Sequence, residues 1–144
     1  MINAIIEAVS AALNGEFGDG CEIYMEEIEQ GLKEPCFFIS CLNSTNELSL
    51  GKRYFRSCQL CIQYFPATRE KKRECNSVAE RLWQCLEYIT IFSRDRQIRG
   101  TKMSYEVVDG VLNFFVNYDR FVFKTEVLTP MDDLETNTNV KEGE

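Results

Sequence analysis

Cys58 and Cys61 have the C-x-x-C spacing that structural zinc sites use, which raises the question of a second ligand pair. The sequence has seven cysteines but no histidine and no second C-x-x-C. Residues 54–65 alternate between apolar and polar side chains, which predicts a strand. Positions i and i+3 of a strand point to opposite faces, so these two thiols cannot bind one ion. The pattern therefore predicts a strand rather than a zinc site.

The other cysteines give no sign of a disulfide framework. Their number is odd, and the N-terminal segment lacks a basic region and carries Glu7 within its apolar stretch, which is not typical of a signal peptide. We therefore expect a protein that is made and kept in a cytoplasm and whose thiols are free and mostly buried, as small hydrophobic side chains.

No pattern in the chain indicates catalysis. Histidine, the commonest general base, is absent, and neither a P-loop nor a dinucleotide-binding motif occurs. The acidic residues Glu26, Glu27 and Glu29 lack the spacing of a calcium loop and are more typical of a solvated edge. We expect no catalytic residue, no bound cofactor and no metal ligand.

The charges are unevenly distributed along the sequence. Residues 1–50 carry nine acidic and one basic side chain (net −8), residues 51–102 five and twelve (+7), and residues 103–144 nine and three (−6). Contact with nucleic acid would explain a basic middle, but the whole chain is acidic, with a pI of about 4.8. Simple mixing of the charges on a soluble surface is another possibility. We favour self-complementarity, in which basic residues of one subunit meet acidic residues of the next.

The residues predicted to form that interface fall into a basic and an acidic set. The densest group is called the basic cluster below and consists of Arg69, Lys71, Lys72 and Arg73. The full prediction comprises Arg53, Arg56, Arg69, Lys71, Lys72 and Arg73 with Glu26, Glu27 and Glu29.

Periodicity predicts a helix over 2–13 that stops near Gly15, and a second helix that begins at the capping box of residues 77–80 and runs to Ile89. Strands are expected over 21–28, 34–42 and 54–65. Residues 43–51 and 93–102 are expected as polar or charged connections, and residues 67–75 as a charged loop or a frayed first helical turn. The stretches 43–53 and 67–76 are expected to be mobile in a free subunit.

Asp109 and Gly110 give the strongest hairpin signal in the chain, between arms at 103–108 and 111–123. The apolar phase of the second arm changes across Asp119 and Arg120, which predicts a bulge or bend there. These elements predict a single α+β domain over 1–128, mainly an antiparallel sheet with two helices packed on one face. An acidic, flexible tail is expected over 129–144.

Four stretches together resemble, in this order, the small tail terminator proteins of phages. They are EEIEQGLKEPCFFI (26–39), GKRYFRSCQLCIQYFP (51–66), ERLWQCLEYI (80–89) and YEVVDGVLNFFVNYDRFVF (105–123). The likeness extends over about residues 2–125. It is greatest to the terminators of defective prophages and of contractile, phage-tail-like bacteriocins of Gram-positive bacteria.

This resemblance implies an α+β protein that assembles as a ring, typically a hexamer, on the finished tail tube. Its implied partners are other copies of itself, the tube protein, the sheath protein and, in a complete phage, the head connector, with no membrane and no sequence-specific nucleic acid. It implies no enzymatic activity or cofactor, and a final location at the head-proximal end of the tail. A head-completion or head–tail connector adaptor and an unrelated cytosolic interaction module remain the alternatives.

Overall fold

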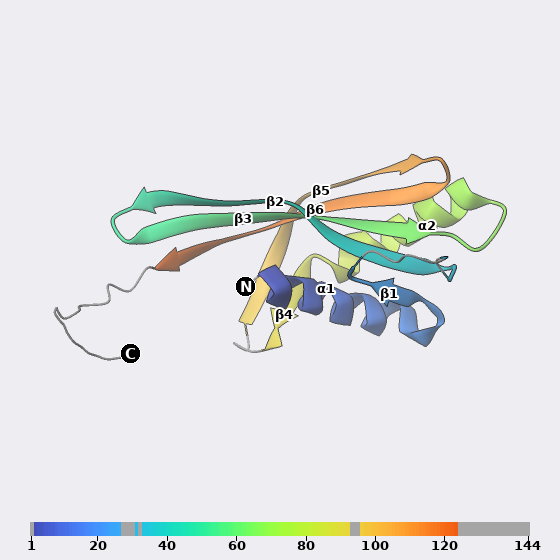
Figure 1. The fold of residues 1–144 in the computed structure, drawn as a ribbon, viewed down its shortest axis with the longest axis horizontal. Coiled ribbons are helices and arrows are strands. Elements are labelled where there is room, and N and C mark those ends of the chain that lie inside the picture. The colour runs from blue at the N-terminus through green and yellow to red at the C-terminus, as the bar shows by residue number, and fades with distance from the viewer. Residues whose placement is uncertain (1, 27–30, 32, 93–95, 124–144) are drawn as a thin grey trace. The chain divides into compact units, whose positions relative to one another are not determined.

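The computed structural model describes residues 2–26, 31, 33–92 and 96–123. Within these ranges the chain forms two α-helices, a short 3-10 helix and six strands (Figure 1). Their bounds are α1 Ile2–Phe17, η1 Gly18–Gly20, β1 Glu22–Tyr24, β2 Cys36–Leu50, β3 Arg53–Phe65, α2 Lys71–Cys85, β4 Tyr88–Ile91, β5 Arg96–Val108 and β6 Val111–Phe123. The predicted α+β class is confirmed.

The six strands form one mixed sheet in the order β1-β2-β3-β6-β5-β4. The short β1 pairs with β2 in parallel, with Glu22 opposite Cys36, whereas β5 pairs with β4 and with β6 in antiparallel fashion. The sheet thus includes one parallel pair that the sequence did not predict. Within the described residues, no helix is long and apolar enough to cross a membrane.

The hydrophobic core lies between one face of the sheet and the two helices. Each helix contributes one apolar stripe at helical spacing, which is the pattern of a helix that covers a sheet. The fully buried side chains of β3 and β6 complete the cluster. The buried helix residues are Ile5, Ala8, Val9 and Leu13 of α1, and Cys75, Val78, Ala79 and Leu82 of α2.

Both helix boundaries differ from the sequence expectation. α1 continues through Gly15 to Phe17, whose ring packs on Phe37 with 4.9 Å between the ring centroids. α2 begins at Lys71 rather than at residue 77, so residues 71–75 are helical and the loop alternative is wrong for them. Glu74, described below, holds the chain that enters this helix.

α2 ends at Cys85, so the prediction that the helix continues to Ile89 is wrong. The Tyr118 hydroxyl donates a hydrogen bond to the Leu86 carbonyl at 2.8 Å, and the Gly100 amide donates one to the Glu87 carbonyl at 2.6 Å. These bonds from β6 and β5 hold the carbonyls that follow the helix, and the chain then enters β4.

Two predicted connections are strands. Residues 43–50 belong to β2, although they are polar and mostly exposed, and residues 96–102 belong to β5. The expectation of loops there is therefore wrong. The strand predicted over 21–28 is present as β1 but covers only Glu22–Tyr24 of the described residues, and residues 27 and 28 lie outside them. Of residues 93–102, only 93–95 lie outside the described part of the chain.

The hairpin prediction at Asp109 and Gly110 is confirmed. Both residues have positive φ, 52° and 76°, as a two-residue turn with right-handed strand twist requires. The pairing of β5 with β6 has a register shift on β5, between Thr101 and Ser104, and the register extends along β6 to Tyr118, short of the bulge or bend predicted across Asp119 and Arg120. Burial on β6 follows the even-numbered residues without interruption from Leu112 to Arg120.

The chain divides into two compact units, which we describe separately. The first comprises Met1–Asn46 with Arg56–Arg120 and contains both helices and the core. The described part of the second comprises residues 47–55 and 121–123. In the second unit Phe55 and Phe121 pack at 5.2 Å between ring centroids. The predicted boundary between a domain and a tail at residue 128 lies outside the described residues.

Candidate functional site

The two cysteines of the C-x-x-C stretch lie on β3 and contact different partners. The Cys58 sulfur lies 3.6 Å from the Cys41 sulfur, whereas the Cys61 thiol donates a weak hydrogen bond to the Asn113 Oδ1 at 4.0 Å. All seven cysteines are free. The predicted strand is confirmed. In the described part of the chain, no three Cys, Asp or Glu side chains form a group that could hold a metal ion.

The basic cluster lies where α2 begins. Its four side chains line a hollow of about 550 Å³, which we call the cluster hollow, and the tip of the β5–β6 hairpin forms the opposite wall with Val107, Asp109 and Gly110. These four residues lie together along one hollow, and three of them are in a helix rather than in a loop. All four are exposed.

Glu74 fixes the segment that carries the basic cluster. Its Oε1 accepts hydrogen bonds from the Thr68 amide at 3.0 Å and the Thr68 hydroxyl at 2.6 Å. Its Oε2 accepts bonds from the Tyr64 hydroxyl at 2.5 Å and the Ala67 amide at 3.1 Å. One carboxylate therefore joins the end of β3 and the following loop to the first turn of α2.

This network shifts the acidities of both its titratable partners. Burial alone would raise the pKa of Glu74, but the hydrogen bonds from Thr68, Tyr64 and Ala67 outweigh it and hold the pKa below its usual value. Burial, together with the bond to the Glu74 carboxylate, raises the pKa of the Tyr64 hydroxyl. Glu74 is thus ionised at neutral pH, as the accepting role requires.

The four cations of the basic cluster are held more loosely than Glu74. Arg73 lies 3.7 Å from the Glu70 carboxylate, but 84% and 69% of these two side chains are exposed, so the pair contributes little to stability. Lysines and an arginine in the first helical turn also face the positive end of the helix dipole, which disfavours them there. A nearby anion would offset that cost, so this surface is suited to contact acidic groups.

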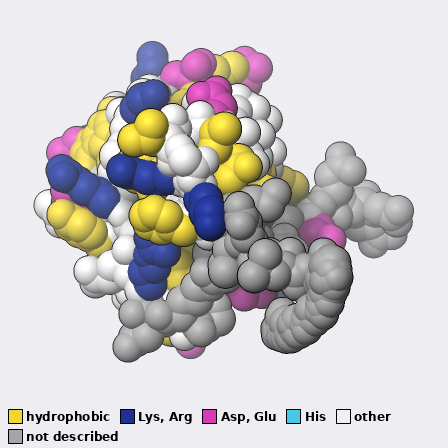
Figure 2. Space-filling view, turned by 90° about the vertical axis from the view of Figure 1, so that its left-hand side faces the viewer, with side chains coloured by type: hydrophobic (Ala, Val, Ile, Leu, Met, Phe, Trp, Pro, Cys, Tyr) yellow, Lys and Arg dark blue, Asp and Glu magenta, His cyan; other side chains and the backbone are white. Residues whose placement is uncertain are grey.

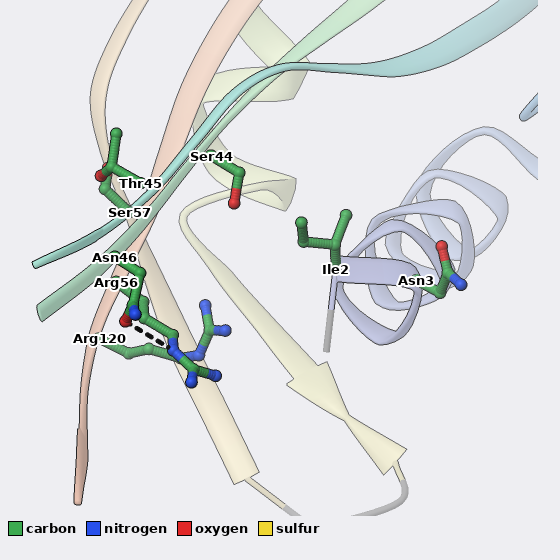
Figure 3. Close-up of a pocket in the computed structure, with 8 residues that line it drawn as sticks. All are labelled: Ile2, Asn3, Ser44, Thr45, Asn46, Arg56, Ser57 and Arg120. Atoms are coloured by element: carbon green, nitrogen blue, oxygen red, sulfur yellow. Dashed lines mark hydrogen bonds between the residues drawn. The ribbon is translucent and has the colours of Figure 1, made fainter. Parts of the chain in front are cut away.

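A second cationic hollow, the arginine hollow, has a volume of about 390 Å³. Arg56 of β3 and Arg120 of β6 both line it, and Figure 3 shows both guanidinium groups on the side that faces the first turn of α1. The Arg56 Nε donates a hydrogen bond to the Asn46 Oδ1 at 3.0 Å. The full lining is Ile2, Asn3, Ser44, Thr45, Asn46, Arg56, Ser57 and Arg120.

Arg120 is the functional candidate that the sequence analysis missed. It is only 7% exposed, the one charged side chain buried among the described residues. The signal was present, because the even-numbered burial of β6 from Leu112 to Tyr118 extends to residue 120. The sequence analysis instead placed a change in the alternation of apolar and polar residues across Asp119 and Arg120.

Of the other predicted interface residues, Arg53 and Glu26 line neither of the two hollows. Arg53 belongs to the second compact unit, where its guanidinium lies 3.9 Å from the centroid of the Phe121 ring. Glu26 is exposed, and Glu27 and Glu29 lie outside the described residues. Figure 2 shows a face on which Lys and Arg side chains stand between hydrophobic ones rather than in one continuous patch.

Comparison with protein families gives one clear match, and it covers most of the chain. Residues 4–130 match the family model described as phage tail terminator protein. No curated protein shows a significant match to the sequence.

Proposed function

The chain belongs to the phage tail terminator family, and we propose that it forms a ring, typically a hexamer, that caps the tail tube. Its role is that of a structural component of a phage tail, not of an enzyme. The proposed ring stops polymerisation of the tube and, in a contractile particle, also contacts the end of the sheath. The family match over residues 4–130 is the observation that carries this proposal.

The surface of the first compact unit is suited to such an assembly. It presents two cationic hollows on a chain whose formal net charge is −7, so neighbouring copies offer many acidic partners to each hollow. A head-to-tail contact between unlike surfaces closes into a ring when the rotation between copies allows it. We propose that the basic cluster supplies one side of that contact and that Glu26, Glu27 and Glu29 contribute to the other.

The proposed partners are further copies of the chain, the tube protein and the sheath protein, with a head connector in particles that carry a head. Assembly in the bacterial cytoplasm would leave the ring at the head-proximal end of the tail. The sequence resemblance is greatest to the terminators of defective prophages and of contractile, phage-tail-like bacteriocins, and we propose a particle of one of these kinds, with or without a head.

Electron microscopy of particles assembled without this protein tests the proposal. Loss of a terminator should leave tubes of uncontrolled length, and expression of the wild-type chain in trans should restore a uniform length. Tails of normal length that fail to join heads would instead indicate a head–tail connector. Unaltered particles would refute both roles.

A further inference from the structure

We propose that the outer side of α1 together with β1 is a docking surface, and that its occupant is the basic cluster of a second copy of this chain. The inference rests on the proposed ring for its place in the particle, and it names the face of one subunit that meets the basic cluster of the next. The charge of this face, its apolar surface and its open sheet edge all fit that occupant.

This face contains a further hollow, the acidic hollow, with a volume of about 520 Å³. Glu7 of α1, Asp19 of η1 and Glu22 of β1 line it, and its described lining includes no lysine or arginine. Figure 1 shows β1 beside the second half of α1, and both belong to the first compact unit. The rest of the lining is neutral and consists of Ser10, Ala11, Asn14, Cys21, Ile23 and Met25.

The three carboxylates of the acidic hollow have no cationic partner within the described residues. All three are exposed, and in the described part of the chain none of them takes part in an ion pair or a side-chain hydrogen bond. By contrast, the Glu16 carboxylate in the last turn of α1 lies 2.9 Å from the Arg81 Nε. Like charges in one hollow repel one another, so cations from another molecule would lower the free energy of this surface.

Helix dipoles disfavour both sets of charges in a free subunit. α1 ends at Phe17 with no basic residue in its last turn, and Asp19 follows at the end where the dipole is negative. The basic cluster lies at the start of α2, where the dipole is positive. Contact between the acidic hollow and the basic cluster would therefore relieve an unfavourable interaction on each side.

The docking surface also offers apolar area and an open sheet edge. Met25 is 47% exposed, and β1 is an end strand of the sheet that, among the described residues, pairs with β2 alone. Beside the basic cluster, Val107 lines the cluster hollow and the neighbouring Val108 is 48% exposed. Apolar area within a polar rim is typical of protein interfaces, where methionine is enriched. Glu26, an interface residue predicted from the sequence, directly follows Met25.

The cluster hollow matches the acidic hollow in size and carries the opposite charge. Its volume is about 550 Å³, and its four exposed cations outnumber the two carboxylates of its lining, Glu70 and Asp109. The acidic and cluster hollows share no residue and are formed by different elements. Each copy thus presents both, and a contact between unlike surfaces of successive copies can close into a ring. Complementary charges would fix the register of that contact and speed association.

Carbodiimide cross-linking tests the contact directly, because the reagent forms an amide between a lysine and a carboxylate that touch. An equal mixture of isotope-labelled and unlabelled chain is treated both as concentrated protein and in assembled tails, and mass spectrometry locates the links. We expect links between labelled and unlabelled copies to join Lys71 or Lys72 to a carboxylate of the acidic hollow. Links from these lysines only to other carboxylates, or no links between copies, would overturn the inference.

Complementary reversal of charge tests the pairing of the acidic and cluster hollows. Glu7→Lys with Glu22→Lys makes the first basic, and Lys71→Glu with Lys72→Glu makes the second acidic, all at exposed side chains. Each double variant alone should associate at least tenfold more weakly than the wild type by sedimentation velocity. An equal mixture should restore association, because every contact in an alternating ring then joins opposite charges. A mixture as weak as its components would contradict the pairing.

Glu47→Lys with Glu106→Lys is the matched control. It makes the same change in net charge as the Glu7 and Glu22 reversal, at exposed positions that line neither the acidic nor the cluster hollow. The control should associate as the wild type does, and circular dichroism should show all variants to be folded. An equal loss of association in the control would mean that net charge rather than the acidic hollow governs the contact, which would overturn the inference.

Failure of the inference and failure of the proposed function give different results. If tails assembled with the Glu7→Lys, Glu22→Lys variant have normal length, the ring proposal stands and the inference fails. If the wild-type chain does not control tail length, the ring proposal fails, while the cross-links in the concentrated free chain still decide whether the acidic hollow meets the basic cluster.

Discussion

The two cationic hollows of the first compact unit differ in how their charges are held. In the cluster hollow, four exposed cations project from one turn of helix and the loop before it, and only the underlying Glu74 is fixed by hydrogen bonds. In the arginine hollow, Arg120 is buried and Arg56 is tied to Asn46. Exposed charges are screened by salt and contribute little each, whereas partly buried ones are screened much less. The first arrangement is suited to attracting a partner and the second to fixing its position.

The largest expected effect is on the support beneath the cluster hollow. Glu74→Ala removes a carboxylate that accepts four hydrogen bonds, so we expect the free energy of unfolding to fall by about 3 kcal/mol. Urea denaturation measures the change. Glu70→Ala is the matched control because its side chain is exposed and paired only loosely with Arg73, and it should cost no more than about 0.5 kcal/mol. Similar losses in both variants would show that the Glu74 network does not support this region.

Reversal of charge in the basic cluster should abolish capping without unfolding the chain. Lys71→Glu combined with Lys72→Glu changes two exposed side chains, and the repulsion it introduces should weaken association at least tenfold, or about 1.4 kcal/mol. Tail lengths in electron micrographs are the measurement. Reversal of two exposed cations elsewhere, Lys33→Glu with Arg96→Glu, is the control.

Normal tail lengths with the Lys71 and Lys72 reversal would remove the basic cluster from the interface. Restoration of capping by Glu26→Lys with Glu27→Lys would identify the acidic partner. If this rescue fails while the first reversal acts as expected, other acids meet the cluster.

Salt should distinguish the two hollows. The Debye length falls from about 10 Å at 0.1 M to about 3 Å at 1 M, so wild-type association should weaken over this range. We expect most of that dependence to vanish in the Lys71→Glu, Lys72→Glu variant and to persist in Arg56→Gln. Sedimentation velocity at the two salt concentrations measures it, and an equal salt dependence in the two variants would mean that the hollows act alike.

Acid should weaken the support of the cluster hollow, because that support is the ionised carboxylate of Glu74. The pKa of Glu74 is lowered in the folded protein, so its contribution to stability is complete above the pKa of about 4.3 in the unfolded chain and is lost as the pH falls through the folded pKa. Denaturation midpoints measured from pH 6 to pH 3 should fall more steeply for the wild type than for Glu74→Gln. Parallel curves would contradict this role of Glu74.

The smallest expected effect is at the hairpin wall of the cluster hollow. Gly110 has φ of 76°, and a Cβ at this position would lie 2.7 Å from the Lys71 Cδ. The lysine end is flexible, so the strained backbone dominates and Gly110→Ala should cost about 1 kcal/mol. Gly15→Ala, in open space within α1, should instead be neutral or stabilising in the same denaturation assay.

Predictions from sequence succeeded where a local rule and the fold agree. Asp109 and Gly110 tolerate positive φ, so the hairpin was predicted correctly, and the alternation of residues 54–65 gave β3. The polar end of β2 was missed because its side chains are mostly exposed, which leaves no alternation to detect. The start of α2 was missed because a capping motif at residues 77–80 lies inside the helix.

The two parts of the candidate site likewise differ in whether a local sequence pattern could predict them. The basic cluster is contiguous in sequence, so charge counting located it. The arginine hollow joins residues that are 64 positions apart, Arg56 and Arg120, on two neighbouring strands of the sheet. Only the order of the strands in the sheet brings them together, and no local pattern contains that order.

The seven free cysteines have a consequence for the chemical durability of the protein. Burial raises the pKa of the Cys36 thiol to about 11 and that of Cys85 to about 12, and burial together with the contact to Cys41 raises that of Cys58 to about 12. The thiolate is the form that reacts with oxidants and with disulfides, and at neutral pH these three sulfurs are almost entirely protonated. In an oxidising medium these three thiols should therefore be oxidised or form disulfide cross-links only slowly, because little of each is present as the reactive thiolate.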